Sequence, residues 1–438
     1  MKRILCLLLA LWLLPLTVWA EEDALTARLV YDLLRSGDTG AVYALLDSTM
    51  QSALPENDLA ALLPALDAAY GAPVRYGEEE TTLAAPYRIT ALPVICERGG
   101  ILFQVTWQEN RIAGLFYSVL PPDESAPAAL PDGLAEEEIE VGEPALPGTL
   151  TWPLNVSSPL PAVVLVHGSG PNDRDETIGQ TKLFRDLAWA LAQQGIAVLR
   201  YDKRTLVYGN TYTADQLKAF TVQEESITDA IAAARLLAGD PRIDAGRVYL
   251  AGHSLGAMIA PRIASENPGL FAGIVLLSGT PKTLGDIVLS QNQAVVDALP
   301  ATTQWIGKMQ LLSLRKEWES LCAASGEQAL GMKVFGQNAY YFWEMAQQDT
   351  GNLLKDLPIP ALIINGGQDF QVTDADGIDA WRALELPGTV QIIHHPALNH
   401  LLMAPDASEE VRGTVQEYDT PCHVSDEVID EIAAFILK

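Results

Sequence analysis

The spacing of hydrophobic positions divides the chain into two parts. Over residues 21–69, apolar residues recur every three or four positions, which is typical of helices. After Gly71, apolar and polar residues alternate, with turn signals near residues 98–100 and 109–111, as in antiparallel strands. Residues 21–120 are therefore predicted to form a small α+β domain. Its first helix, in "ALTARLVYDLLRSG", is predicted to place four leucines on one face: Leu25, Leu29, Leu33 and Leu34.

From Pro161 onward, short continuous apolar runs alternate with helical patterns. The runs are "AVVLVH", "GIAVLRYD", "RVYLAGH", "GIVLLSG", "ALIINGG" and "VQIIHH". Such strands predict a mostly parallel sheet that helices cover on both faces. Residues 281–357 interrupt the alternation with a helical stretch, which we expect to form a lid. Residues 121–138, rich in proline, alanine and acid, are predicted to be a linker, and residues 139–438 a second domain.

The first twenty residues, "MKRILCLLLALWLLPLTVWA", combine a basic pair, an apolar run and small residues before Glu21. This order predicts a secretory signal peptide cut after Ala20, and hence a secreted or extracytoplasmic protein of the cell envelope. The alternative is a membrane anchor, although the apolar run is near the short limit for spanning a bilayer and no second such run occurs. Cys6 is not preceded by the small residues of a lipoprotein cleavage site, so no lipid anchor is expected.

Charge and cysteine content exclude several kinds of partner. The net charge is −28, and removing residues 1–20, with two basic and no acidic side chains, leaves −30. Such a surface repels nucleic acid and anionic membranes, so we expect no nucleic-acid partner and no stable membrane insertion after cleavage. Cys96, Cys322 and Cys422 are widely spaced, which predicts no disulfide framework but leaves one bridge open. No H-E-x-x-H or comparable spacing occurs, so no metal and no cofactor are predicted.

The stretch "VYLAGHSLGAMIA" contains a G-x-S-x-G motif centred on Ser254. An apolar strand precedes the motif and a helical pattern follows it, which is the context of a nucleophile on a sharp strand-to-helix turn. The flanking glycines suit a strained turn that a neighbouring strand and helix crowd. The motif alone also occurs by chance, so its assignment depends on the partners that a serine nucleophile requires.

One partner is an oxyanion hole, and "HGSGP", directly after the strand "AVVLVH", is the candidate loop. In sites of this type, one backbone N–H comes from this loop and one from the residue after the nucleophile, which here are Ser169 and Leu255. The alternative is a phosphate-binding loop, but the Lys and Ser/Thr of a P-loop are missing.

The other partners are a base and an acid that follow the serine in the chain. "ALIINGGQD" places Asp369 just past one strand, and "VQIIHHPALNH" places His400 just past the next, at the same sheet edge as Ser254. Asp374 and Asp376 are competing acids, nearer the following helix. The other five histidines are assigned structural or surface roles: His167, His253, His394, His395 and His423. Of His394 and His395, which end a strand, His395 is the better candidate to line the site.

Polar residues follow the "HGSGP" loop in "NDRDE" and recur in "RYDKR" at the end of another strand. They are predicted either to form an ion-paired network that shapes the site, in which Arg174 could meet a substrate carboxylate, or to form a rigid solvated loop. Asp202, at the strand end, is expected to fix the neighbouring loop.

The segments "HGSGPNDRDE", "LAWALAQQGIAVLRYDKR", "AGHSLG", "IINGGQDFQVT" and "LNH" together resemble the bacterial α/β-hydrolase superfamily, in its serine aminopeptidase-like or dienelactone-hydrolase-like esterase branch. The resemblance covers residues 139–438 and implies an α/β-hydrolase fold with a helical lid, preceded by the small α+β domain. Residues 30–120 resemble an uncharacterised domain found before such hydrolases, which implies a cystatin-like or NTF2-like fold.

The resemblance implies a secreted serine esterase that cleaves small carboxylic esters through an acyl-enzyme on Ser254, with His400 as base and Asp369 orienting it. An aminopeptidase or amidase would use the same residues, with acids of the lid binding the amine: Glu317, Glu319 or Glu344. A third hypothesis is a ligand-binding protein with a hydrolase-like domain, whose N-terminal domain would bind through its aromatic residues: Tyr87, Phe103, Trp107 or Phe116. Six lid aromatics weakly indicate an apolar acyl pocket: Trp305, Trp318, Tyr340, Tyr341, Phe342 and Trp343. Neither the acyl group nor the oligomeric state follows from the sequence.

Overall fold

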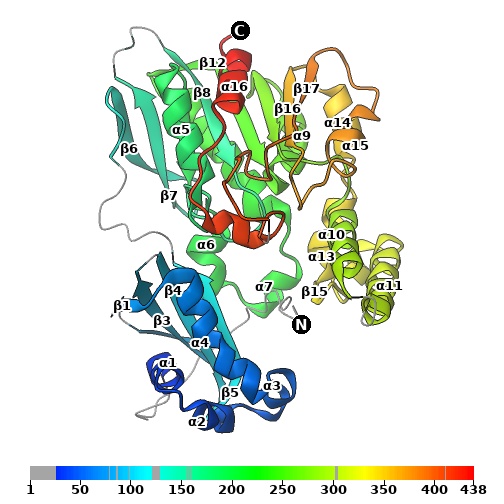
Figure 1. The fold of residues 1–438 in the computed structure, drawn as a ribbon. Helices are drawn as coiled ribbons and strands as arrows, with labels where there is room; N and C mark the ends of the chain where they lie inside the picture. The colour runs from blue at the N-terminus through cyan, green and yellow to red at the C-terminus, as the bar shows by residue number, and fades with distance from the viewer. Residues whose placement is uncertain are drawn as a thin grey trace. The chain divides into compact units, whose positions relative to one another are not determined.

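A computed structural model describes residues 26–77, 79–84, 87–97, 99–120, 129–154, 156, 159–300, 304–409 and 411–438 (Figure 1). The chain separates into two compact units, Met1–Ala128 and Ala129–Lys438, each of which is described by itself. The predicted signal peptide, residues 1–20, lies outside the described residues.

The first unit packs helices against an antiparallel sheet. Its elements are α1 (Ala27–Arg35), α2 (Thr39–Leu45), α3 (Ser48–Ala53), α4 (Glu56–Tyr70), β1 (Pro73–Tyr76), β2 (Glu80–Ala84), β3 (Tyr87–Cys96), β4 (Gly99–Gln108) and β5 (Arg111–Val119). The sheet order is β1-β3-β4-β5. β1 and β2 both pair with the same edge of β3: β1 with its C-terminal half and β2 with its N-terminal half. The small α+β domain predicted from the change in periodicity is thus present.

The predicted leucine face of α1 is correct for Leu34, which is buried, and for Leu33, which packs against the core, but wrong for Leu29. Leu29 is 38% exposed, Leu25 lies outside the described residues, and the buried face consists of Ala27, Val30, Tyr31 and Leu34. The reason is aromatic packing: the Tyr31 ring lies 5.2 Å from the Phe103 ring in an edge-to-face contact, and this large side chain draws its own helix face into the core.

The four aromatic residues considered for a binding face in this unit do not share a face. Phe103 and Trp107 are buried in the core that the helices cover, whereas Tyr87 and Phe116 are exposed on the sheet. Alternate residues of a strand point to opposite faces of the sheet. By this alternation, Phe103 and Trp107 point to the face that the helices cover, and Tyr87 and Phe116 point to the other face. They therefore do not line one pocket.

The second unit contains the remaining elements. The strands are β6 (Leu134–Val141), β7 (Leu146–Pro153), β8 (Leu160–Val166), β9 (Thr177–Ile178), β10 (Thr181–Lys182), β11 (Ala197–Tyr201), β12 (Ile243–His253), β13 (Gly273–Leu277), β14 (Lys333–Val334), β15 (Gln337–Asn338), β16 (Ala361–Gly366) and β17 (Val390–His395). The α-helices are α5 (Leu183–Gln193), α6 (Arg204–Tyr208), α7 (Ala214–Lys218), α8 (Thr228–Gly239), α9 (Leu255–Glu266), α10 (Leu284–Ala298), α11 (Gln304–Cys322), α12 (Gly326–Ala329), α13 (Ala339–Ala346), α14 (Thr350–Asp356), α15 (Ile378–Arg382) and α16 (Asp426–Ile436). A π-helical turn, η2 (Gln223–Ile227), precedes α8, and two 3₁₀ turns are η1 (Gly209–Thr211) and η3 (Val415–Asp419).

Eight of these strands form one sheet in the order β17-β16-β13-β12-β8-β11-β7-β6. The six from β17 to β11 are parallel, and β7 and β6 continue the sheet antiparallel. In β8, Val164 packs with α8 and α9 on one face, and Val163 packs with α5 and α16 on the other. This two-sided burial explains the continuous apolar runs and confirms the predicted fold class.

The predicted linker is shorter than residues 121–138, because β6 already begins at Leu134. The acidic run in β6 is not solvated spacer: the Glu136 carboxylate accepts a hydrogen bond from Arg200, at 2.9 Å, and the Glu138 carboxylate pairs with Arg174. Arg174 and Arg200 neutralise these glutamates from 36 and 64 residues further along the chain. The composition of residues 121–138 alone gives no sign of these partners.

The lid segment, residues 281–357, has a hydrophobic cluster of its own. α10, α11 and α13 bury a shared set of side chains, among them Leu311, Trp318 and Phe342. The two-residue strands β14 and β15 form a small hairpin that the helical pattern did not indicate. Leu354 of α14 and Met345 of α13 instead join the core of the main sheet, together with side chains of α9.

The parts of the chain that the structure describes contain neither a disulfide nor a membrane-spanning helix. Cys96, Cys322 and Cys422 are free thiols, so the bridge that the sequence left open is not formed. None of the helices described there has both the length and the apolar character needed to cross a bilayer.

Candidate active site

Ser254 occupies a sharp turn between β12 and α9. Its φ of 52° and ψ of −113° are unusual for a non-glycine residue. The turn is held by its backbone: the Ser254 N–H donates to the Leu277 carbonyl at 2.9 Å, and the Ser254 carbonyl accepts from the Met258 N–H at 3.1 Å. A strained backbone of this kind persists only when its surroundings fix it, and it is typical of functional positions.

The two motif glycines are required by close backbone packing. A Cβ at Gly252 would lie 2.2 Å from the Gly256 carbonyl oxygen, and a Cβ at Gly256 would lie 2.1 Å from the Val166 carbonyl oxygen. The turn is therefore wedged between its own helix and the central strand β8.

Alanine at position 256 should prevent folding or weaken it severely, because its Cβ would meet the backbone of a central strand, 2.1 Å away. We expect the free energy of unfolding to fall by at least about 4 kcal/mol, measured by urea denaturation. Gly239→Ala is the matched control, since nothing lies within 4 Å of a Cβ there. An equal loss in both variants would contradict the steric explanation.

The loop after β8 lies directly against the turn. A Cβ added at Gly168 would be 3.2 Å from the Ser254 Cβ, which places Gly168, the residue before Ser169, beside the serine. Among the described residues, neither the Ser169 N–H nor the Leu255 N–H donates to a protein acceptor. Both sequence-predicted donors are thus present next to Ser254 with unused N–H groups.

Asp369 and His400 form a buried pair at the same edge of the sheet. The His400 Nδ1 lies 2.6 Å from the Asp369 Oδ2, and both residues are almost fully buried. The other oxygen, Oδ1, accepts from the N–H groups of Gln371 and Val372, both at 2.8 Å. The carboxylate is held from two sides, so it fixes the imidazole with Nε2 as the atom available for proton transfer.

The competing acids have other partners. Asp374 lies 2.9 Å from His394 Nε2, and Asp376 binds Lys282, Ser290 and Thr373. His395, the better strand-end candidate to line the site, instead contacts Glu431 of α16 at 2.8 Å, because it ends a strand beside that helix. His395 therefore has the structural role predicted for both strand-end histidines, and its partners belong to α16.

The x residue of the motif, His253, belongs to a second buried charge pair beneath the turn. Its Nδ1 lies 3.2 Å from the Glu176 Oε1, and its Nε2 donates to the His400 carbonyl at 3.1 Å. Burial alone would lower the pKa of His253, but the Glu176 carboxylate outweighs it and raises that pKa. Burial alone would raise the pKa of Glu176, but the interaction with His253 outweighs burial and holds that pKa below its usual value. The pair links the nucleophile turn to the backbone of the candidate base.

Glu176→Gln should weaken the fold most between about pH 4.5 and 6.5, the usual pKa values of the two groups. The raised pKa of His253 gives stability that is complete below its usual pKa and is lost as the pH rises through the raised value. The lowered pKa of Glu176 gives stability that is complete above its usual pKa. We expect a loss of about 3 kcal/mol near about pH 6, which shrinks as the pH rises through the raised pKa of His253, measured by thermal unfolding.

The control for this experiment is Glu431→Gln, which removes the carboxylate next to His395, a more exposed histidine. It should change stability by less than about 1 kcal/mol at any pH. A Glu176→Gln loss that does not vary with pH would contradict the charge-pair assignment.

Arg174 is not available to a substrate. Its guanidinium donates to both oxygens of Asp202, at 3.1 Å each, and to Thr149 at 2.8 Å, and it pairs with Glu138. The predicted ion-paired network is therefore present, but Arg174 is committed to it and not to a substrate, and Asp202 fixes the loop as expected.

Sequence reasoning missed three buried charged residues around the "HGSGP" loop: Glu176, Lys203 and Glu225. The Gly168 N–H donates to Glu176 at 2.7 Å, and the Lys203 Nζ donates to the Gly168 carbonyl at 2.7 Å. A lysine two residues after a buried strand was a usable signal for Lys203. Glu225 lies in a helical turn, and no local pattern marks it.

Most of the lid aromatics stabilise the lid itself. Trp318 and Phe342 lie in its cluster, Tyr340 stacks on Trp343 at 5.5 Å, and the Tyr341 hydroxyl donates to Glu225. Trp305 is exposed. The aromatic content of the lid therefore does not define an acyl pocket.

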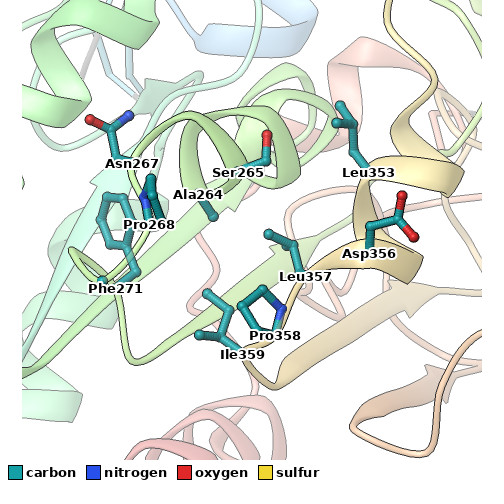
Figure 2. A pocket seen from close by; sticks show the side chains of 11 residues that line it. Ala264, Ser265, Asn267, Pro268, Phe271, Leu353, Asp356, Leu357, Pro358 and Ile359 are labelled. Carbon is teal, nitrogen blue, oxygen red and sulfur yellow. The ribbon is translucent and has the colours of Figure 1, made fainter.

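A cavity of about 140 Å³ lies between the C-terminal end of α9 and α14 (Figure 2). Its lining includes Ala264, Phe271, Leu357 and Ile359. Ser254 stands at the opposite end of α9, a helix of 12 residues that spans about 18 Å. This cavity is separate from the candidate active site.

Comparisons with known proteins agree with the fold. The family model described as "Alpha/beta hydrolase family" matches residues 163–414. Esterase EstD of Thermotoga maritima is 36% identical over 364 residues, which cover 82% of each chain. Among solved structures, a Pyrococcus furiosus esterase is 16% identical with a TM-score of 0.42, covering 69% of this chain and 91% of that one. A Pyrococcus horikoshii acylaminoacyl peptidase is 13% identical with a TM-score of 0.44, covering 84% of this chain and 56% of that one.

Proposed function

Because this chain belongs to the α/β hydrolase family, we propose that it hydrolyses carboxylic esters of small molecules through an acyl-enzyme on Ser254. One observation carries the proposal: the strained Ser254 turn shares a sheet edge with the buried Asp369–His400 pair. The relative named as an esterase, which covers 82% of this chain, supports the ester class.

In the proposed reaction, His400 Nε2 takes the proton of the Ser254 hydroxyl as its oxygen attacks the ester carbonyl. The N–H groups of Ser169 and Leu255 stabilise the oxyanion of the tetrahedral intermediate. His400 then gives the proton to the leaving alcohol, and the acyl group remains on Ser254. A water molecule, activated by the same imidazole, releases the acid and restores the serine.

The lid acids give little support to the aminopeptidase alternative. Glu317 accepts from the Phe335 N–H at 3.2 Å, and Glu344 pairs with Arg262 of α9. Both carboxylates are engaged within the protein, which leaves the exposed Glu319 as the remaining candidate for binding an amine.

The first test is hydrolysis of p-nitrophenyl esters from acetate to octanoate, combined with covalent labelling by a fluorophosphonate. We expect turnover, with an optimum chain length that sizes the acyl site, and mass spectrometry should locate the label on Ser254. Turnover of amides with silence on every ester would overturn the ester class, and a label on another serine would overturn the nucleophile.

We also propose that the mature protein acts outside the cytoplasm, because residues 1–20 have the composition of a cleavable signal peptide. N-terminal sequencing of the exported protein should begin at Glu21. A cytoplasmic protein that retains Met1–Ala20 would contradict this.

A further inference from the structure

Lys203 is a charged residue in an almost completely enclosed position. It follows β11, is 1% exposed, and its Nζ lies 2.7 Å from both the Gly168 carbonyl oxygen and the Glu225 Oε1. An ammonium group is costly to bury without close partners, so these two contacts keep it in one place. The mechanism described above does not use this lysine.

The Gly168 carbonyl belongs to the same peptide group as the Ser169 N–H. A trans peptide is planar, and its C=O and N–H point in opposite directions. A donor that fixes the carbonyl oxygen therefore also fixes the direction of the N–H on the other side. The Ser169 N–H has no protein acceptor among the described residues, so this is an unused donor held in a set direction beside Ser254.

Lys203 is the strongest of the groups that hold this peptide. The Asn172 Nδ2 also donates to the Gly168 carbonyl, at a longer 3.3 Å, whereas the lysine bond is charge-assisted and shorter. Glu176 anchors the preceding peptide through the Gly168 N–H. The positive charge additionally polarises the peptide and makes its N–H a better donor to a negative oxygen.

The partner of Lys203 connects this arrangement to the lid. Glu225 accepts a hydrogen bond from the Tyr341 hydroxyl of α13, while its other oxygen binds Lys203. A lid helix thus takes part in fixing the lysine.

We infer that Lys203 is a positioning residue that aims the Ser169 N–H at the developing oxyanion, held in place by Glu225. This inference rests on the proposed function. It predicts that the lysine stabilises the tetrahedral intermediate more than it strengthens binding of the substrate.

The test uses Lys203→Met combined with Glu225→Gln, because the methionine alone would leave Glu225 buried without its cation. Wild type and the double variant are compared in kcat and KM for a p-nitrophenyl ester. They are also compared in affinity for a trifluoromethyl ketone, which forms an oxyanion on serine, and for the matching alcohol, which does not. We expect kcat and ketone affinity to fall about 10- to 100-fold, with KM and alcohol affinity within about threefold.

The matched control is Arg204→Met with Asp229→Asn, which neutralises the neighbouring buried ion pair, 2.5 Å apart. It should lower the melting temperature and leave kcat within about twofold. A folded Lys203 double variant with wild-type kcat would overturn the inference, as would equal losses of ketone and alcohol affinity. If the wild type does not hydrolyse the ester, or if Ser254→Ala hydrolyses it equally well, the proposed function is overturned, and this inference with it.

Discussion

Ser254→Ala should abolish ester hydrolysis, lowering kcat by at least about 10⁴-fold, while the protein remains folded. The alanine cannot form an acyl-enzyme, whatever the state of His400 and Asp369. The turn itself should survive, because Ser254 is held by backbone hydrogen bonds to Leu277 and Met258 and not by its side chain. The measurement is burst-phase and steady-state release of p-nitrophenol, with thermal unfolding measured in parallel.

Ser278→Ala is the matched control for this experiment. Ser278 also follows a strand of the sheet with a positive φ, 49°, and its buried hydroxyl has no hydrogen-bond partner among the described residues. We expect turnover within about twofold of wild type. If Ser254→Ala keeps a tenth of the activity, Ser254 is not the nucleophile.

Asp369→Asn should lower kcat by about 10⁴-fold with little change in the fold. The asparagine can keep the backbone N–H groups of Gln371 and Val372 bound through its oxygen. Its amide group would then face His400 Nδ1 as a donor, which favours the tautomer with the proton on Nε2. A protonated Nε2 cannot take the serine proton, so the loss should appear in kcat and in the rate of fluorophosphonate labelling.

Asp374→Asn serves as the control, because Asp374 is the neighbouring acid and contacts His394 at 2.9 Å instead of His400. Its activity should stay within about twofold of wild type. Similar losses in both variants would mean that the orienting acid has been assigned to the wrong residue.

The sheet of the second unit could be predicted because its signals are local. Each central strand is buried on both faces and therefore appears as a continuous apolar run, as in "AVVLVH". The candidate triad followed from the same logic, since Ser254, Asp369 and His400 each come just after such a strand. Parallel strands bring these positions to one edge regardless of their separation in sequence.

What escaped prediction depends on contacts between distant residues. The acidic run of β6 looks like a solvated spacer until Arg174 and Arg200 are placed beside it. Likewise, Lys203 and Glu225 become recognisable only when the folded chain surrounds them, and Tyr341 reaches Glu225 from 116 residues away. The face of α1 was mispredicted in part for a related reason. The pattern followed the leucines, whereas the contact between the Tyr31 and Phe103 rings places Tyr31 in the core and leaves Leu29 exposed.

The acidic character of β6 has a consequence for association between chains. β6 is an edge of the eight-stranded sheet, and four of its eight residues are glutamates. An unpaired edge is a template on which a strand of another molecule can add. Three of the four already pair with arginines of the same chain: Glu136 with Arg200, Glu137 with Arg242 and Glu138 with Arg174. A strand that added to this edge would have to fit its side chains among these ion pairs, so the edge carries charged groups where an aggregating strand would need apolar contacts.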